Sequence, residues 1–367
     1  MRLCSSFLGT LLLAAFTLPL AAQQVPIPVP AEKQPSLTVD TDPVPSPDAA
    51  VPAPPMQKEQ QGGAAVQRGA GGGYTIRRDV EEVVLNATVL DQNGRLVNTL
   101  TKDDFKVYED NVLQTIAAFQ HSDLPVSMGI LVDNSGSMHD KRGAVNAAAL
   151  DLVRASNPED EAFIVNFSDE AFIDQEFTSN ISKLQDGLSH IDAKGGTALY
   201  DAVVASADEL SKGAKQPKQV LLVITDGEDN ASSLTLEQTI RRIQDLQGPV
   251  VYSIGLLFGS DSSRESHRAQ RALQLLSDET GGIAFFPKNL GQVDAIANEV
   301  ARDIRSQYTI GYHSTKPASL GGYRVVRVEA HAPHMKLIVR TRSGYYPRAA
   351  GSKTAQGSGI TLQSGQQ

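Results

Sequence analysis

Hydroxyl and carboxylate side chains are concentrated in three short segments of this chain. The first segment contains Asp133, Ser135 and Ser137, which are spaced two residues apart after an apolar run. The second contains Thr197, and the third contains Asp226, again directly after an apolar run. If the three segments meet, two carboxylates and three hydroxyls surround one point. Oxygen ligands of this kind suit Mg²⁺, with Mn²⁺ or Ca²⁺ as alternatives, better than they suit zinc or copper.

The pattern of residues 124–306 predicts the elements that bring these segments together. Runs that are apolar on both faces, such as 127–133 and 219–225, are typical of buried strands in a parallel sheet. Amphipathic stretches alternate with these runs and predict helices on both faces of the sheet. Ligands bind outside the carboxyl ends of the strands in such a sheet. We therefore expect a doubly wound, mostly parallel α/β fold with the polar segments at one sheet edge.

The expected boundaries follow from the same periodicity. The predicted strands are 127–133, 162–168, 172–177, 219–225, 249–257 and 282–286. The predicted helices are 143–155, 181–191, 199–210, 236–246, 264–279 and 293–304.

Short β segments flank this region on both sides. Residues 74–123 contain strand-like runs and an Asn93-Gly94 pair, which is a strong hairpin turn signal. Residues 307–347 return to strand-like runs. We predict that the two segments pair into one small β-sandwich-like domain.

The first 22 residues have the features of a secretory signal peptide. Arg2 precedes an apolar stretch over residues 7–20, and small residues stand before a polar break at Gln23. The stretch is interrupted and is shorter than the ~20 apolar residues that a membrane span needs. We expect cleavage near Ala22, which also removes Cys4. The mature chain is then exported, periplasmic or extracellular, without a membrane span.

Two further segments are poor in core-forming residues. Ten of the 19 prolines lie between Pro26 and Pro55, and glycines follow them, so residues 23–73 are predicted to be a disordered linker. Residues 348–367 are predicted to be a disordered tail.

Composition and motifs argue against several classes of function. The chain carries 33 Lys and Arg against 42 Asp and Glu, a net charge of −9, which argues against nucleic-acid binding. One cysteine can form neither an intramolecular disulfide nor a cysteine-based zinc site. The chain lacks the G-x-x-x-x-G-K-[ST] motif of a phosphate-binding loop and the G-x-S-x-G motif of a serine hydrolase.

Three motifs in a fixed order carry a family resemblance. They are Asp133-x-Ser135-x-Ser137, Gly195-Gly196-Thr197 and Thr225-Asp226-Gly227. This set resembles the metal-ion-dependent adhesion site of the von Willebrand factor type A (VWA) domain. The β flanks, residues 90–111 and 308–346, are similar to those of the bacterial exported "VWFA-related domain" family.

The resemblance implies a role for each of the five residues. Ser135, Ser137 and Thr197 would be direct or near-direct ligands of the metal. Asp133 and Asp226 would lie mainly behind them, holding ligand waters and orienting hydroxyls. A cation held by neutral hydroxyls and water keeps much of its charge and attracts a carboxylate from a partner protein. The implied function is a non-catalytic, metal-dependent adhesion module whose partner and oligomeric state the sequence does not specify.

Other interpretations stay open at this point. Asp133 and Ser135 are also residue types that cap helices. Residues 228–230 are either a second cation site or, more simply, a solvated loop or helix cap. An exported metal-dependent hydrolase would need a base such as Asp140 or Glu228 near the metal. A scaffold that binds its partners without metal is the third possibility.

Overall fold

The computed structural model describes residues 82–155, 157–189, 194–258 and 264–348, and the backbone of three short strands outside them. The predicted signal peptide, residues 1–22, lies outside the described residues, as do most of the predicted linker and tail. Two of the short strands, β1 (Ala65–Arg68) and β2 (Tyr74–Arg77), pair antiparallel with each other. None of the described helices is long and apolar enough to cross a membrane.

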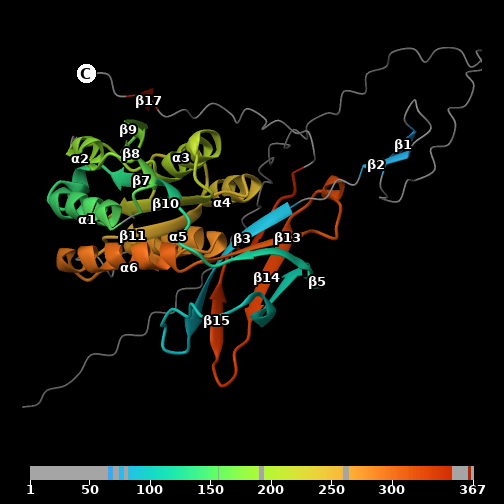
Figure 1. The fold of residues 1–367 in the computed structure, drawn as a ribbon. Coiled ribbons are helices and arrows are strands. Elements are labelled where there is room, and N and C mark those ends of the chain that lie inside the picture. Colours follow the sequence, from blue (N-terminus) through green and yellow to red (C-terminus); the bar gives the residue numbers. More distant parts are fainter. Residues whose placement is uncertain are drawn as a thin grey trace, which may run out of the picture. The chain divides into compact units, whose positions relative to one another are not determined.

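A central sheet occupies the middle of the chain. Among the described residues it has seven strands, in the order β12-β11-β10-β7-β8-β9-β17. In chain order these are β7 (Val126–Asp133), β8 (Glu161–Phe167), β9 (Ala171–Thr178), β10 (Lys218–Thr225), β11 (Val250–Gly255), β12 (Ala284–Phe285) and β17 (Gln363–Ser364). Neighbours are parallel except β8 and β9, which run antiparallel. The predicted mostly parallel sheet is confirmed (Figure 1).

Helices cover both faces of this sheet. They are α1 (Arg142–Arg154), α2 (Ile181–Ser189), α3 (Leu199–Gly213), α4 (Leu236–Asp245), α5 (Arg264–Thr280) and α6 (Val293–Arg305). Side chains of α1, α2 and α6 form one buried cluster with the sheet, and those of α3, α4 and α5 form another on the opposite face. Burial of strands on both faces explains why β7 is apolar along nearly its whole length.

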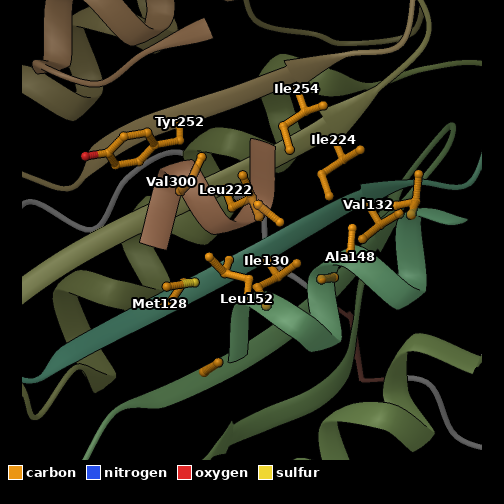
Figure 2. Close-up of a cluster of buried hydrophobic side chains, with 14 of the residues drawn as sticks. Met128, Ile130, Val132, Ala148, Leu152, Leu222, Ile224, Tyr252, Ile254 and Val300 are labelled. Carbon is orange, nitrogen blue, oxygen red and sulfur yellow. The ribbon is translucent and has the colours of Figure 1, made fainter. Parts of the chain in front are cut away.

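Figure 2 shows how the first cluster is assembled from elements distant in the sequence. Met128, Ile130 and Val132 on β7 face Ala148 and Leu152 of α1. Neighbouring strands and α6 complete it with Leu222, Ile224, Tyr252, Ile254 and Val300. This packing fixes β7 and β10 beside each other, and their ends carry the candidate site.

The predicted boundaries hold to within two residues except at the end of α3, which is predicted at residue 210 and lies at Gly213. The strand predicted at 282–286 is limited to residues 284–285, and before it the backbone of Gly282 passes too close to Val251 for a side chain. A Cβ at Gly282 would lie 1.9 Å from the carbonyl oxygen of Val251. The helix predicted to end at residue 191 is described only to Ser189, and residues 190–193 lie outside the described part.

The flanking segments form two four-stranded sheets in the described region, ordered β15-β3-β13-β6 and β16-β14-β4-β5. The strands are β3 (Glu82–Asp91), β4 (Phe105–Glu109), β5 (Val112–Gln114), β6 (Ile116–Gln120), β13 (Tyr308–His313), β14 (Arg324–Ala330), β15 (Leu337–Arg340) and β16 (Gly344–Tyr345). Each sheet combines strands from before and after the α/β region, and buried side chains of both sheets form one cluster.

Asn93-Gly94 lies in a turn, as predicted, but the residues after the turn form only one bridge with β3 and no strand. Gly94 has a φ of 76°, and its N–H donates to the carbonyl of Asp91 at 3.0 Å. The returning chain makes a single bridge, Leu90 to Leu96, before it leaves the sheet. The long partners of β3 are β13 and β15, which come from the far end of the chain.

Candidate metal centre

The candidate site lies where β7 and β10 end. The two strands are adjacent and parallel, with Val132 opposite Ile224, so their carboxyl ends meet at one edge of the sheet. Asp133 is the last residue of β7, and Asp226 directly follows β10. This placement agrees with the expectation from the sequence.

Asp133 is buried and holds the two strand ends together. Its Oδ1 accepts a hydrogen bond from the backbone N–H of Ser135 at 2.8 Å, and its Oδ2 accepts one from the Thr225 hydroxyl at 2.6 Å. Burial raises the pKa of the Asp133 carboxyl, and the hydrogen bonds from Thr225 and Ser135 act in the opposite direction. Since both its oxygens already have donors, Asp133 shapes the loop around the site.

Ser135, Ser137 and Asp226 form a continuous chain of contacts. The hydroxyl oxygens of Ser135 and Ser137 are 3.2 Å apart. The Ser137 hydroxyl donates to Oδ1 of Asp226 at 2.8 Å, across 89 positions of sequence. Donation of this proton leaves lone pairs of the Ser137 oxygen available for another partner.

Thr197 reaches the same edge from the segment before α3. Its N–H donates to the side chain of Asn230 at 2.8 Å, and its carbonyl accepts from the backbone N–H of Asn230 at 3.0 Å. Thr197, Ser137 and Asp226 line one cavity of about 530 Å³. Asp133 and Ser135 adjoin this cavity through the contacts of Ser135 with Asp133 and Ser137. The five residues predicted from the sequence thus come from three separate segments and lie at one end of the sheet.

The glycines before Thr197 are required by the backbone. Gly195 has a φ of 83°, a conformation that residues with a Cβ rarely adopt. A Cβ there would lie 2.3 Å from Oδ2 of Asp169. The next N–H, of Gly196, donates to Oδ1 of Asp169 at 2.7 Å. Asp169 therefore anchors this loop, although no motif in the sequence singled it out.

The donor set fits a hard divalent cation. Hydroxyls and carboxylates converge on one edge, and they are the oxygen ligands that Mg²⁺, Mn²⁺ and Ca²⁺ prefer. In the described part of the chain, no group of three or more His, Cys, Asp or Glu side chains is gathered that could hold a metal. A cation at this edge would therefore depend on the serine and threonine hydroxyls.

Two basic residues that sequence reasoning missed lie at the site. The ammonium of Lys141 pairs with Oδ2 of Asp226. The side chain of Arg142 is fully buried, donates to Oδ1 of Asn166 at 2.8 Å, and approaches the carbonyl of Asp133 at 3.5 Å. Burial lowers the pKa of Arg142 to about 10. Lys141 and Arg142 follow Ser137 by only four and five residues, which could have indicated a place near the site. Two basic residues at the start of a helix are, however, ordinarily solvated.

The alternative roles weighed for the acidic residues find little support. The helix that directly follows Asp133 and Ser135 is a single 3-10 turn, Gly136–Met138, which has Ser135 at its N-cap position but no side-chain capping hydrogen bond. Helix α1 begins only at Arg142. Glu228 pairs with Arg268, with an oxygen-to-nitrogen distance of 2.9 Å. Glu228 and Arg268 both line the cavity, where they pair with each other. Asp133 and Ser135 contact each other within the loop after β7.

Asp229 and Asp140 have different surroundings, although both lie near the candidate site in the sequence. Oδ2 of Asp229 accepts from the backbone N–H of Tyr200 at 3.0 Å and from the Ser232 hydroxyl at 2.5 Å, so it supports the first turn of α3. The side chain of Asp140 is 98% exposed and forms an ion pair with its neighbour His139. Asp229 lines the same cavity as Ser137 and Thr197, but its Oδ2 is already engaged by its two donors.

Comparisons with known proteins agree with this architecture. The model of the von Willebrand factor type A domain matches residues 128–228. Inter-alpha-trypsin inhibitor heavy chain H4 of Bos taurus is 22% identical over 228 residues, which are 58% of this chain and 22% of that protein. This chain thus spans about a fifth of that relative.

Solved structures of similar proteins were also found. A von Willebrand factor type A structure from Catenulispora acidiphila is 13% identical, with a TM-score of 0.43 and 75% of each chain covered. Proximal thread matrix protein 1 of the mussel byssus, in a form whose MIDAS motif is occupied by zinc, is 15% identical with a TM-score of 0.43, covering 54% of this chain and 50% of that one. The family match, the mostly parallel sheet and the three motifs at its edge lead to one identification: this chain contains a von Willebrand factor type A domain.

Proposed function

We propose that this chain is an exported, non-catalytic module that binds a partner protein through a divalent cation. The observation that carries the proposal is the convergence of Ser135, Ser137 and Asp226, which contact one another although they come from two different strand ends. Thr197 lines the same cavity. The match of residues 128–228 to the von Willebrand factor type A domain is consistent with the adhesion role that the resemblance implies.

In this proposal the hydroxyls of Ser135, Ser137 and Thr197 are the ligands, and Asp133 and Asp226 orient them. The Ser137 hydroxyl donates its proton to Asp226, which keeps the oxygen lone pairs directed at the cation. Asp133 holds the loop by accepting from Ser135 N–H and from Thr225. When bound, Mg²⁺, or Mn²⁺ or Ca²⁺ in its place, supplies an open position for a carboxylate of the partner.

The first test is metal-dependent thermal stability. Adding Mg²⁺ to the metal-free protein should raise its melting temperature by several degrees, because a ligand at about 100 times its Kd stabilises the folded state by about 2.7 kcal/mol. The double variant Ser135→Ala with Ser137→Ala should lose this response. Ser182→Ala, an exposed serine on α2, is the matched control and should keep it. A wild-type protein whose melting temperature ignores Mg²⁺, Mn²⁺ and Ca²⁺ would refute the metal site.

Partner capture tests the second part of the proposal. The full chain immobilised as bait should retain a protein from an envelope extract in Mg²⁺ and release it in a chelator, and the double serine variant should retain none. Equal retention with and without the chelator would instead favour a scaffold that needs no metal.

A further inference from the structure

The carboxylate of Asp226 already forms an ion pair with a side chain of the protein, Lys141. Its Oδ2 pairs with the ammonium of Lys141, and its Oδ1 accepts from the Ser137 hydroxyl at 2.8 Å. Both oxygens of this proposed metal-site carboxylate are therefore engaged by the protein itself.

The ammonium of Lys141 is held on two sides. The Lys141 side chain is 21% exposed and that of Asp226 is 1% exposed. The nitrogen also lies 5.4 Å from the centroid of the Phe258 ring, within the range of a cation–π contact. Lys141 immediately precedes α1, so its backbone is fixed close to the serine loop. The ion pair is partly buried, since only the Asp226 carboxylate is enclosed, and it is less hydrated than a pair between two surface side chains.

We propose that Lys141 is a built-in competitor of the metal. Its ammonium neutralises Asp226 in the metal-free protein and must leave this carboxylate before a divalent cation is held beside it. The inference rests on the proposed function, because it assumes that a cation binds at this edge. A divalent cation and the Lys141 ammonium would repel each other if both lay beside the enclosed carboxylate of Asp226.

The competition has a measurable consequence for affinity. If only the fraction of molecules with Lys141 displaced accepts metal, the apparent Kd is the intrinsic Kd divided by that fraction. Lys141 then lowers metal affinity while it stabilises the metal-free fold. Removing its charge should change the two properties in opposite directions.

The test uses the full chain and Mn²⁺, whose free concentration is read by electron paramagnetic resonance. Lys141→Met should bind Mn²⁺ about tenfold or more tightly than the wild type. Its metal-free form should melt at a lower temperature, since Asp226 loses its partner, and excess Mn²⁺ should remove this deficit. Lys183→Met changes the same charge on the exposed face of α2 and should match the wild type. Lys141→Gln keeps an N–H donor for Asp226 and reports the charge effect if Lys141→Met does not fold.

The outcomes separate this inference from the proposed function. If the wild type and Lys183→Met bind Mn²⁺ as tightly as both Lys141 variants, the competitor role is wrong and the metal site stands. Weaker binding in the Lys141 variants also overturns it, because Lys141 would then support the site. If no form of the protein binds Mn²⁺, the proposed function fails together with the inference.

Discussion

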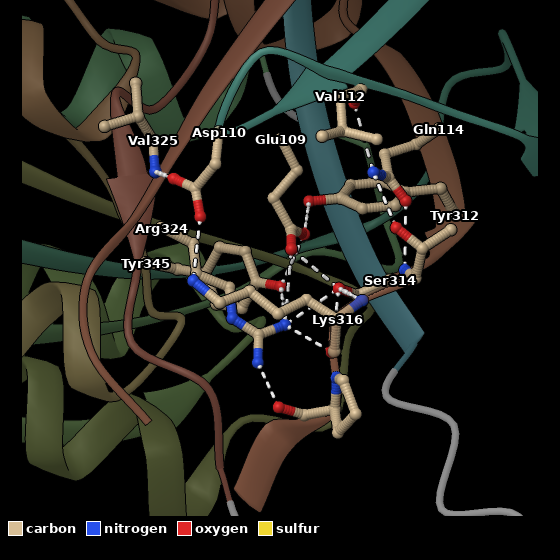
Figure 3. A network of polar contacts seen from close by, with 12 residues as sticks. Glu109, Asp110, Val112, Gln114, Tyr312, Ser314, Lys316, Arg324, Val325 and Tyr345 are labelled. Carbon is tan, nitrogen blue, oxygen red and sulfur yellow. Dashed lines mark hydrogen bonds and ion pairs between the residues drawn. The ribbon is translucent and has the colours of Figure 1, made fainter. Parts of the chain in front are cut away.

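At the scale of single residues, the polar network of the flanking β region shows how a buried charge is made tolerable. Glu109 is 2% exposed and accepts from the hydroxyls of Tyr312 at 2.8 Å and Tyr345 at 2.9 Å (Figure 3). It also accepts from Ser314 at 2.7 Å and from the fully buried Arg324 at 3.3 Å. Burial, together with the neighbouring Tyr345 and Glu109, raises the pKa of the Tyr312 hydroxyl. Each buried charge thus has its partner.

Replacing one member of this network should be costly. Glu109→Leu leaves Arg324 buried without its carboxylate, and we expect the free energy of unfolding to fall by about 3–5 kcal/mol. The control is Glu329→Leu. Glu329 forms an exposed ion pair with Arg327, and both residues lie on β14, the strand that carries Arg324. We expect its free energy of unfolding to change by no more than about 0.5 kcal/mol. Urea unfolding followed by circular dichroism measures both. Equal losses in the two variants would contradict a special role for the buried network.

At the scale of elements, strand β10 links the site to the opposite end of the sheet. Asp226 follows its last residue, and Lys218 is its first. The Lys218 side chain is buried, and its ammonium donates to the carbonyl of Ile304 at 3.0 Å, in the last turn of α6. A cation is favourable at the C-terminus of a helix. Burial nevertheless lowers the pKa of Lys218 to about 8, because desolvation outweighs the nearby carboxylates.

This lowered pKa predicts a pH dependence of stability. Between its folded pKa of about 8 and its usual value of 10.5, Lys218 keeps its proton in the unfolded chain and loses it in the folded one. Stability therefore rises with pH in this window, by about 2 kcal/mol relative to Lys218→Met. Below about pH 7 Lys218 is protonated in both the folded and the unfolded chain, and the difference between the two proteins should be constant. Chemical denaturation from pH 6 to 10 checks this, and a constant difference throughout would contradict the shift.

At the scale of the whole molecule, Asp303 joins the α/β region to the flanking β region. It lies on α6 and accepts from Tyr252 of β11 at 2.5 Å. Both of its oxygens contact Nη2 of Arg340, on β15, at 2.6 Å. Thr88 of β3 contributes a further contact at 3.4 Å. One buried carboxylate therefore connects α6 to three strands, one from the α/β region and two from the flanking β region.

Breaking this joint should reduce cooperativity. Arg340→Leu leaves Asp303 without its guanidinium, and we expect calorimetric unfolding to separate from one transition into two, with the first at lower temperature. Arg327→Leu, on the exposed face of β14, should keep a single transition. A single, merely shifted transition in Arg340→Leu would mean that other contacts carry the coupling.

Much of the α/β region follows from local pattern. Apolar runs predicted β7, β8, β10 and β11, because a strand buried on both faces needs apolar residues on both. Strand pairing in the β flanks did not follow in the same way. The pattern marks β3 as a strand, but its partners β13 and β15 lie more than 200 positions away, and alternation within a strand carries no information about its neighbours.

The sequence by itself determined the alternation of strands and helices and the order of the three polar motifs. Parallel strands end at a common edge, so these two facts together placed Asp133 and Asp226 on one side of the sheet. Only the tertiary structure decided that Lys141 pairs with Asp226 and that Asp303 binds Arg340. These ion pairs join side chains that are distant in the sequence, and their formation depends on how the helices and strands pack. The spacing of residues along the chain does not specify such contacts.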